Sequence, residues 1–311
     1  MTGRAPHGAL PLTSDGVRMA ASPGSTTVGL AGLGNIGRPM GVALLKAGWS
    51  LTVYDTSQEK AGALEQAGAH IAATPAELSA CDVLLLAVPD DAAVESLLEG
   101  PSGWLAHGGD RRTVVVHSTV MPATAARLAN VAEARGVGLL DAPVSGGADR
   151  AERGDLTVMV GGDADVIERV RPVLDAVGSR VVRVGPPGAG AATKLANQLM
   201  MLSALAGAQE ALELAAAHGV DEEKVLEVVT SCTGDSWVAR NWDFFDRTSA
   251  AYDAGGTPVR DRPWSKDLFE VVQAARAVEV RVPVAGLLAQ VLADRVEARA
   301  ARTGAAEGSA S

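Results

Sequence analysis

Aromatic residues and cysteines are both scarce in this chain of 311 residues, at 3% of the residues and two residues, respectively. Cys81 and Cys232 lie far apart and have no neighbouring ligand pattern, which argues against a disulfide framework. We therefore predict two buried thiols in a reducing compartment, the cytoplasm. The five histidines show no metal-ligand spacing, so no metal site is expected.

An excess of positive charge is also absent, since the formal net charge is −10. Nucleic-acid binding depends on neutralising phosphates, so a general nucleic-acid binder is excluded. Although 47% of the residues are hydrophobic, there is no apolar run near the ~18 residues of a membrane span, and none is expected. Residues 1–24 and 303–311 are rich in small and polar residues, and both are predicted to be disordered tails.

A glycine-rich turn follows the first predicted strand. TTVGLA is β-branched and apolar, GLGNIG follows at once, RPMGVALLKAG predicts a helix, and LTVY predicts a second strand that ends at Asp55. In this context Gly32 permits a tight turn, Gly34 lets a pyrophosphate approach, and Gly37 allows close helix–strand packing. Asp55 is placed to accept hydrogen bonds from a ribose diol. The predicted dinucleotide-binding residues are Gly32, Leu33, Gly34, Asn35, Ile36, Gly37 and Asp55.

Strand and helix patterns alternate as far as residue 187, which predicts a Rossmann-type α/β domain over residues 25–187. In such a sheet the loops after the strands lie at the carboxyl edge, where ligands bind. Val88-Pro89, Ser118-Thr119 and Ser145-Gly146-Gly147 are therefore expected to surround one cleft.

One long helix is predicted between Gly188 and Gly219, because Ala, Leu, Met, Gln and Glu dominate and nothing breaks the pattern. Lys194, Asn197 and Gln198 share one face of its first turns. The run from Leu199 to Ala208 has only Ser203 as a polar side chain, so we expect the helix to be buried on every side. Lys194 then either faces a ligand cleft or is paired structurally. Helical patterns follow, which predicts an all-α domain over residues 188–302 joined through this interdomain helix.

Five motifs in this order resemble the β-hydroxyacid dehydrogenase family, which includes 3-hydroxyisobutyrate dehydrogenase and tartronate semialdehyde reductase. The resemblance covers about residues 26–300 and implies a dimer or higher oligomer. It makes Lys194 the catalytic lysine, with Asn197 or Gln198 orienting the substrate hydroxyl. It places the substrate carboxylate at Ser145, Gly146 and Gly147, and the nicotinamide side of the cofactor at Val88, Pro89, Thr119 and Lys266. The motifs are GLGNIGRPM, DAPVSGG, GDLTVMVGG, GAGAATKLANQ and KDL.

The chemistry that these residues allow is hydride transfer between a nicotinamide and a small β-hydroxy acid, or its semialdehyde. Lys194 would donate a proton in reduction and remove one in oxidation. Desolvation and a cationic nicotinamide would both lower its pKa. NAD is expected rather than NADP, because Asp55 repels a 2′-phosphate and Thr56-Ser57 offers no arginine.

The segment before KDL departs from the family pattern. Because Trp264 lies two residues before Lys266, we expect an aromatic wall in the substrate pocket. Arg260 or Arg262 could pair with a second anionic group and form a cationic rim. Such a pocket favours a β-substituent somewhat bulkier or more apolar than that of tartronate semialdehyde.

Two other functions remain open from the sequence. Imine reductases share the two-domain plan but usually lack a lysine at the position of Lys194. A dinucleotide-binding protein without turnover would also carry the glycine-rich turn. As a rival acid–base group, His117 sits at a strand end, where a histidine is more often a core residue.

Overall fold

The computed structural model describes residues 20–309, apart from 101–102, 108 and 110–111. Its first half is built on one nine-stranded sheet with the order β3-β2-β1-β4-β5-β6-β8-β7, and β9 pairs with β8. The strands from β3 to β6 are parallel, whereas β8 runs antiparallel to β6 and β7. The strands are β1 (Thr27–Ala31), β2 (Ser50–Tyr54), β3 (His70–Ile71), β4 (Val83–Leu86), β5 (Thr113–Val116), β6 (Gly138–Asp141), β7 (Val144–Ser145), β8 (Thr157–Gly161) and β9 (Arg180–Gly185).

Helices cover both faces of this sheet, which explains why β4 and β5 are apolar on both sides. Side chains of α1, α2 and α6 form one core with the sheet, and side chains of α3 and α4 form the other. The helices of this domain are α1 (Gly37–Lys46), α2 (Gln58–Glu65), α3 (Asp91–Glu99), α4 (Pro122–Glu133), α5 (Gly147–Glu152) and α6 (Ala164–Val177), with short 3-10 helices at Pro75–Ala80 and Trp104–His107.

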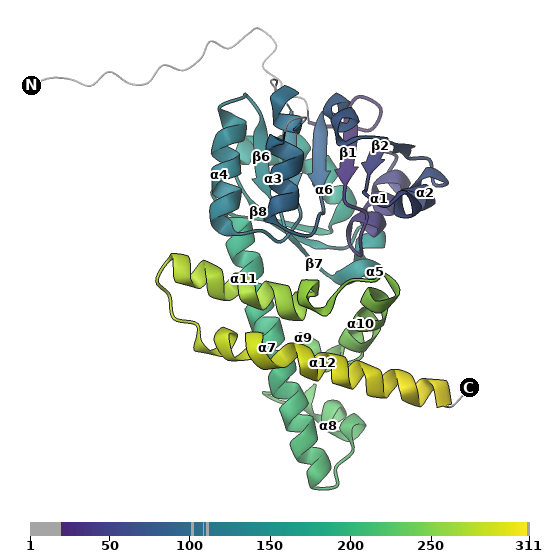
Figure 1. Ribbon diagram of the computed structural model, residues 1–311, viewed down its shortest axis with the longest axis vertical. Helices are drawn as coiled ribbons and strands as arrows, with labels where there is room; N and C mark the ends of the chain where they lie inside the picture. Colours follow the sequence, from purple (N-terminus) through teal and green to yellow (C-terminus); the bar gives the residue numbers. More distant parts are fainter. Residues whose placement is uncertain (1–19, 101–102, 108, 110–111, 310–311) are drawn as a thin grey trace, which may run out of the picture.

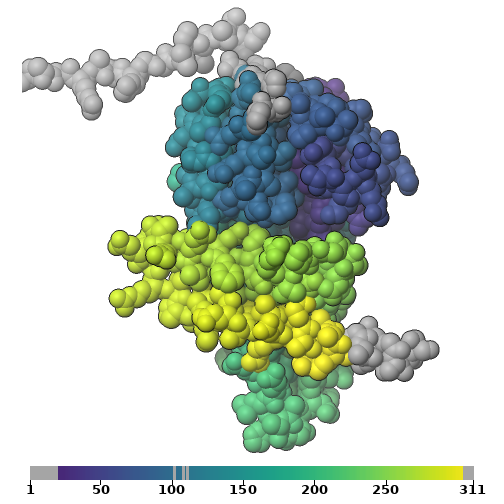
Figure 2. All heavy atoms as spheres, viewed as in Figure 1, coloured from purple at the N-terminus to yellow at the C-terminus, as the bar shows by residue number. Residues whose placement is uncertain are grey.

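The second half of the chain is helical and lies below the sheet domain in Figures 1 and 2. Helix α7 descends from the sheet domain through the whole helical domain, and α11 crosses between the sheet domain and α12 (Figure 1). A separate apolar core joins α7 with α9 to α12. The elements are α7 (Ala189–Ala217), α8 (Glu222–Val229), α9 (Trp237–Arg240), α10 (Phe244–Ala254), a 3-10 turn at Val259–Asp261, α11 (Pro263–Ala277) and α12 (Pro283–Ser309). The predicted fold class is confirmed.

The two predicted tails differ from the structure where it describes them. Residues 1–19 lie outside the described residues, but Ala21 is buried and its N–H donates to the Arg169 carbonyl at 2.8 Å. At the other end, α12 continues to Ser309 rather than fraying from residue 303. The alanines of this segment have high helix propensity, which outweighs its glycines.

Helix α7 is not buried on every side in the single chain, contrary to expectation. Its buried residues follow one face, while Met200 and Leu214 are 74% and 64% exposed. By length and composition it is the one membrane-span candidate among the described residues, and 22% of its most apolar window is buried. The apolar residues of α7 were expected to pack against other parts of the protein. Within a single chain, only one face of the helix does so. Cys232 is likewise exposed, whereas Cys81 is buried as predicted.

Candidate active site

The start of α7 is attached to the end of β6. The Asp141 carboxylate accepts hydrogen bonds from the N–H groups of Gly188 and Ala191, both at 2.8 Å. Gly188, the residue before the helix, has no side chain to cap it and adopts a left-handed φ of 91°. Burial raises the pKa of the Asp141 carboxyl, and the two N–H donors oppose that rise. Asp141 therefore caps the helix that carries Lys194, a role that the sequence motif alone did not reveal.

The Lys194 ammonium is held between the two domains. Its Nζ donates to the Val144 carbonyl at 3.0 Å and to Gln198 Oε1 at 3.0 Å. Gln198 Nε2 in turn donates to Asp267 Oδ2 at 2.5 Å, so α7 is linked to α11. Asn197 Nδ2 also donates to Gln198 Oε1, at 3.2 Å. The oxygen and the nitrogen of the Gln198 amide thus both bond to protein groups. Among the described residues, the side-chain oxygen of Asn197 accepts no hydrogen bond.

Burial lowers the pKa of Lys194, and the negative charge of Asp267 opposes this effect. Smaller influences come from Lys266, which lowers the pKa further, and from Glu270, which raises it. A lysine whose neutral form becomes accessible nearer neutral pH can act as a general base as well as a general acid. A salt bridge would have had the opposite effect, and no carboxylate contacts the Lys194 Nζ among the described residues. The structure therefore favours the cleft-facing alternative for Lys194 over a structural ion pair.

The predicted carboxylate loop begins one residue after the carbonyl that holds Lys194. Ser145, Gly146 and Gly147 are each partly exposed. Gly146 and Gly147 have φ values of 146° and 77°, where a side chain would be strained. A Cβ on Gly147 would also lie 2.9 Å from the Phe244 ring, so this loop packs against the helical domain. The structure brings Ser145–Gly147 next to Lys194 through Val144.

The glycine-rich turn has the shape that a dinucleotide requires. A Cβ on Gly32 would lie 2.9 Å from the Val88 side chain, whereas a Cβ on Gly34 would meet nothing within 4 Å. No side chain caps α1, so its N-terminal end is free to attract an anion. Asp55 lies beside the turn, with one carboxylate oxygen 2.7 Å from the Leu33 N–H and the other 2.8 Å from the Ser57 N–H.

The two predicted loops on the nicotinamide side are tied to each other. The Val88 N–H donates to Ser118 Oγ at 2.9 Å, across the ends of β4 and β5. Thr119 is partly exposed and Pro89 is exposed at the same edge. Lys266 lies on α11, where its Nζ is 3.2 Å from Asp267 Oδ1 and 2.7 Å from Glu270 Oε1. Asp267 and Glu270 were not among the predicted site residues.

The predicted aromatic wall is wrong, and Arg262 does not form the predicted cationic rim. Trp264 is 1% exposed, packs among the rings of the helical core, and donates its Nε1 hydrogen to Glu297 at 2.8 Å. Arg262 is also buried and is bound by Asp253 and Glu297. Arg260 is exposed, with Asp261 at 3.7 Å. The proximity of Trp264 to Lys266 in sequence misled, because residues two apart on a helix face different directions.

His117 is a core residue, as its position indicated. It is 4% exposed, and its Nδ1 lies 2.7 Å from the Ala142 carbonyl. Burial lowers its pKa to about 4, so the ring is neutral at physiological pH. No hydrogen bond joins it to Lys194 among the described residues.

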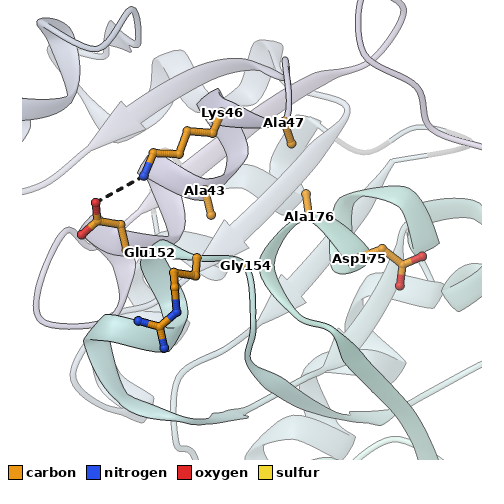
Figure 3. A pocket seen from close by; sticks show the side chains of 8 residues that line it. Ala43, Lys46, Ala47, Glu152, Gly154, Asp175 and Ala176 are labelled. Carbon is orange, nitrogen blue, oxygen red and sulfur yellow. Dashed lines mark hydrogen bonds and ion pairs between the residues drawn. The ribbon is translucent and has the colours of Figure 1, made fainter.

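A hollow on the surface of the sheet domain lies apart from the predicted site residues. It has a volume of about 450 Å³ and lies between α1, α5 and the end of α6, as Figure 3 shows. An exposed ion pair at 3.3 Å between Lys46 and Glu152 forms one side. None of the predicted site residues lines it. This hollow therefore does not bear on the predicted site.

Two family models together match most of the chain. Residues 27–185 match the NAD binding domain of 6-phosphogluconate dehydrogenase, and residues 188–310 match the NAD-binding domain of NADP-dependent 3-hydroxyisobutyrate dehydrogenase. A 3-hydroxyisobutyrate dehydrogenase of Pseudomonas aeruginosa is 34% identical over 90% of this chain and 95% of its own length. The chain belongs to the β-hydroxyacid dehydrogenase family. It is an oxidoreductase of the kind that uses a nicotinamide dinucleotide.

Other members of this family are similar to the same extent. An NAD-dependent L-serine dehydrogenase of P. aeruginosa is 34% identical over 84% of this chain and 89% of its own length. The crystal structure of a 3-hydroxyisobutyrate dehydrogenase from Salmonella typhimurium is 32% identical, with a TM-score of 0.74 over 88% of this chain and 95% of that one. An imine reductase from Pseudomonas sp. is 21% identical over 85% of this chain and 91% of its own, with a TM-score of 0.61, and shares the fold.

Proposed function

We propose that this β-hydroxyacid dehydrogenase interconverts a small β-hydroxy acid, of the 3-hydroxyisobutyrate type, and its semialdehyde, with Lys194 as general acid and base. The observation that carries the proposal is the enclosure of the Lys194 ammonium between the Val144 carbonyl and Gln198, beside the Ser145–Gly147 loop. The bound nicotinamide supplies or accepts the hydride. Lys194 supplies a proton to the carbonyl oxygen in reduction and removes it from the hydroxyl in oxidation.

The neighbouring residues have separate roles in this proposal. The Ser145 hydroxyl and the backbone of Gly146 and Gly147 bind the substrate carboxylate. The free carbonyl oxygen of Asn197 is available to the substrate hydroxyl, while Gln198 is occupied by Lys194 and Asp267. Gln198 therefore orients Lys194 rather than the substrate.

On the cofactor side, the Gly32–Gly37 turn binds the pyrophosphate and Asp55 binds the adenosine ribose. The open space above Gly34 supports this assignment. Val88, Pro89, Thr119 and Lys266 line the nicotinamide side. We favour NAD over NADP because the Asp55 carboxylate would repel a 2′-phosphate.

The substrate is proposed to be small. With Trp264 and Arg262 both inside the helical core, the argument for a bulky or apolar β-substituent no longer holds. Of the two predicted arginines, only Arg260 remains available to a second anionic group. Relatives of nearly equal identity are named for different acids, namely L-serine, 3-hydroxyisobutyrate and, in Escherichia coli, L-threonate at 35%. What these acids share is a carboxylate near a hydroxyl group, and we assign that pattern to this site.

We also propose that a second copy of the chain covers the exposed apolar side of α7. Met200 and Leu214 on α7, together with Val284 and Leu287 on α12, are more than half exposed. Such side chains in an otherwise charged protein mark an association surface. Light scattering of the purified protein should give a dimer or a multiple of it, and Met200→Glu should shift the distribution towards monomer. Retention of monomer mass by the wild type contradicts this assignment. The cytoplasm remains the proposed compartment.

The experiment that tests the function is a turnover screen. Wild-type enzyme and Lys194→Ala are assayed with NAD and NADP over branched, hydroxymethyl and amino-substituted β-hydroxy acids. In reverse, they are assayed with the reduced cofactors on the semialdehydes of these acids and on a cyclic imine. We expect turnover of at least one acid and its loss in the variant. Dinucleotide binding without turnover across the panel would favour the non-catalytic alternative, and turnover of cyclic imines instead would favour the imine reductase.

A further inference from the structure

Glu270 is a buried acid, and one of its carboxylate oxygens accepts no hydrogen bond among the described residues. It lies one helical turn after Lys266 on α11 and is 8% exposed. Its Oε1 accepts a hydrogen bond from Lys266 Nζ at 2.7 Å. Its Oε2 is buried and has no hydrogen-bond partner in the part of the chain that the structure describes. A buried acceptor without a donor is unfavourable, and such atoms occur where a ligand completes the site.

Glu270 lies near charged groups of both domains. On its own helix it faces Lys266 and Asp267, and its charge acts on Lys194 across from α7. From the sheet domain it faces Asp91, the first residue of α3, which follows the Val88-Pro89 edge. Figure 1 shows α11 crossing directly beneath this domain. Charged groups of both domains, Lys194 and Asp91 among them, therefore act on Glu270.

No neighbouring group supplies the missing donor. Asp91 is itself an acceptor, since it receives the Met121 N–H at 3.1 Å. Lys266 is already balanced by Asp267, so charge neutrality does not require Glu270.

We propose that Glu270 binds the nicotinamide half of the dinucleotide, with Oε2 accepting a hydrogen bond from a hydroxyl or amide N–H donor of that half. This inference rests on the proposed function, in which Lys266 lines the same side of the cofactor. It adds an acid to the predicted residues of the nicotinamide side, which are Val88, Pro89, Thr119 and Lys266.

The proposal has a consequence for pH. Burial, only partly opposed by Lys266, raises the Glu270 pKa to about 7 in the free protein. A donor to Oε2 favours the carboxylate, so binding lowers this pKa and releases a proton. The affinity for the whole dinucleotide is then expected to increase up to about tenfold between roughly pH 6 and pH 8. ADP, which lacks the nicotinamide half, should show no such increase from Glu270.

Calorimetry on the full chain tests this with NADH and ADP as probes at three pH values. Glu270→Gln replaces Oε2 with an amide NH₂ group and removes the titration. It is expected to weaken NADH binding about tenfold at the highest pH, to abolish the pH dependence, and to leave ADP binding within about twofold of the wild type. Glu213→Gln is the matched control, because Glu213 is an exposed acid of α7 that pairs with Arg295.

The outcomes separate this inference from the function itself. Unchanged NADH affinity and pH dependence in Glu270→Gln would overturn it, and so would an equal loss for NADH and ADP. Either result leaves the Lys194 proposal standing if the wild type still turns over. Glu270→Gln removes a buried charge and is expected to fold. Glu270→Ala is the second variant, with the same predicted difference between the two probes.

Discussion

Gly190, in the first turn of α7, lies so close to the end of β6 that any side chain there would collide with Asp141. A Cβ on Gly190 would be 2.9 Å from the Asp141 carboxylate and 2.5 Å from the Met159 carbonyl. The same carboxylate accepts the N–H groups that open the helix. Lys194 follows one turn later, so this contact sets the position of the proposed catalytic group relative to the sheet.

Gly190→Ala is therefore expected to destabilise the protein by about 2 kcal/mol or more, because backbone atoms must move. Denaturant unfolding measures the change. Gly62→Ala in α2 is the matched control, since a Cβ there meets nothing within 4 Å. That control should stabilise the protein by roughly 0.5–1 kcal/mol, as alanine does in a helix. Equal stability of the two variants would contradict the close packing.

Lys194→Ala is expected to reduce kcat by about 10²–10⁴-fold, which is the usual contribution of a positioned proton-transfer group. Its Kd for NADH should stay within about threefold, because the lysine contacts Val144 and Gln198 rather than the glycine-rich turn. Steady-state kinetics and fluorescence titration measure both values. A folded variant with near-wild-type kcat removes Lys194 from the mechanism.

The pH dependence of the two directions should be opposite. Burial lowers the pKa of Lys194 below its usual 10.5, so the neutral form becomes accessible at lower pH. Oxidation needs the neutral amine, and its kcat/KM should rise with pH through this pKa. Reduction needs the ammonium, and its kcat/KM should fall through the same pKa. Profiles of kcat/KM against pH, measured in both directions, check these opposite slopes. The pH dependence that Lys194 causes should be absent in Lys194→Ala.

Asp55 should make the enzyme prefer NADH to NADPH by at least tenfold in kcat/KM, because a carboxylate repels the 2′-phosphate. Asp55→Asn is expected to narrow this ratio, mainly through KM for NADPH. The asparagine keeps one side-chain oxygen, which can still accept the hydrogen bond that the Leu33 N–H donates to Asp55 at 2.7 Å. A wild-type preference for NADPH of tenfold or more would show that the role assigned to Asp55 is wrong.

The substrate carboxylate should be required. An acid and its amide, compared as substrates, should differ by at least an order of magnitude in kcat/KM in favour of the acid. The charge-assisted contact at Ser145–Gly147 is worth roughly 1.5–3 kcal/mol. Ser145→Ala should reduce the ratio between the two substrates. Equal use of acid and amide contradicts a carboxylate site and supports a neutral-carbonyl reductase.

The sequence was sufficient for the features that depend on neighbours along the chain. The GLGNIG turn and the helix from Ala189 to Ala217 follow from local backbone preferences and side-chain periodicity. The family model matches confirm the domain types that these patterns predicted. The Val88-Pro89 and Ser118-Thr119 loops could be placed together because parallel strands end at one edge.

Contacts between distant segments could not be obtained in this way. Trp264 was assigned to the pocket from its distance in sequence to Lys266, yet packing against Glu297 and the core rings draws it inside. The contact of Gln198 with Asp267 and the capping role of Asp141 were also missed. Each joins segments at least 47 residues apart. Periodicity shows that a face is apolar but not which surface covers it.

The sequence by itself determined the two-domain fold, the dinucleotide turn and the presence of a lysine at the start of a long apolar helix, because helix propensity, glycine conformations and strand patterns are local properties. Only the tertiary structure decided which groups surround that lysine. Its pKa depends on burial and on the charges of Asp267, Lys266 and Glu270. These three residues lie on α11, about 70 residues further along the chain.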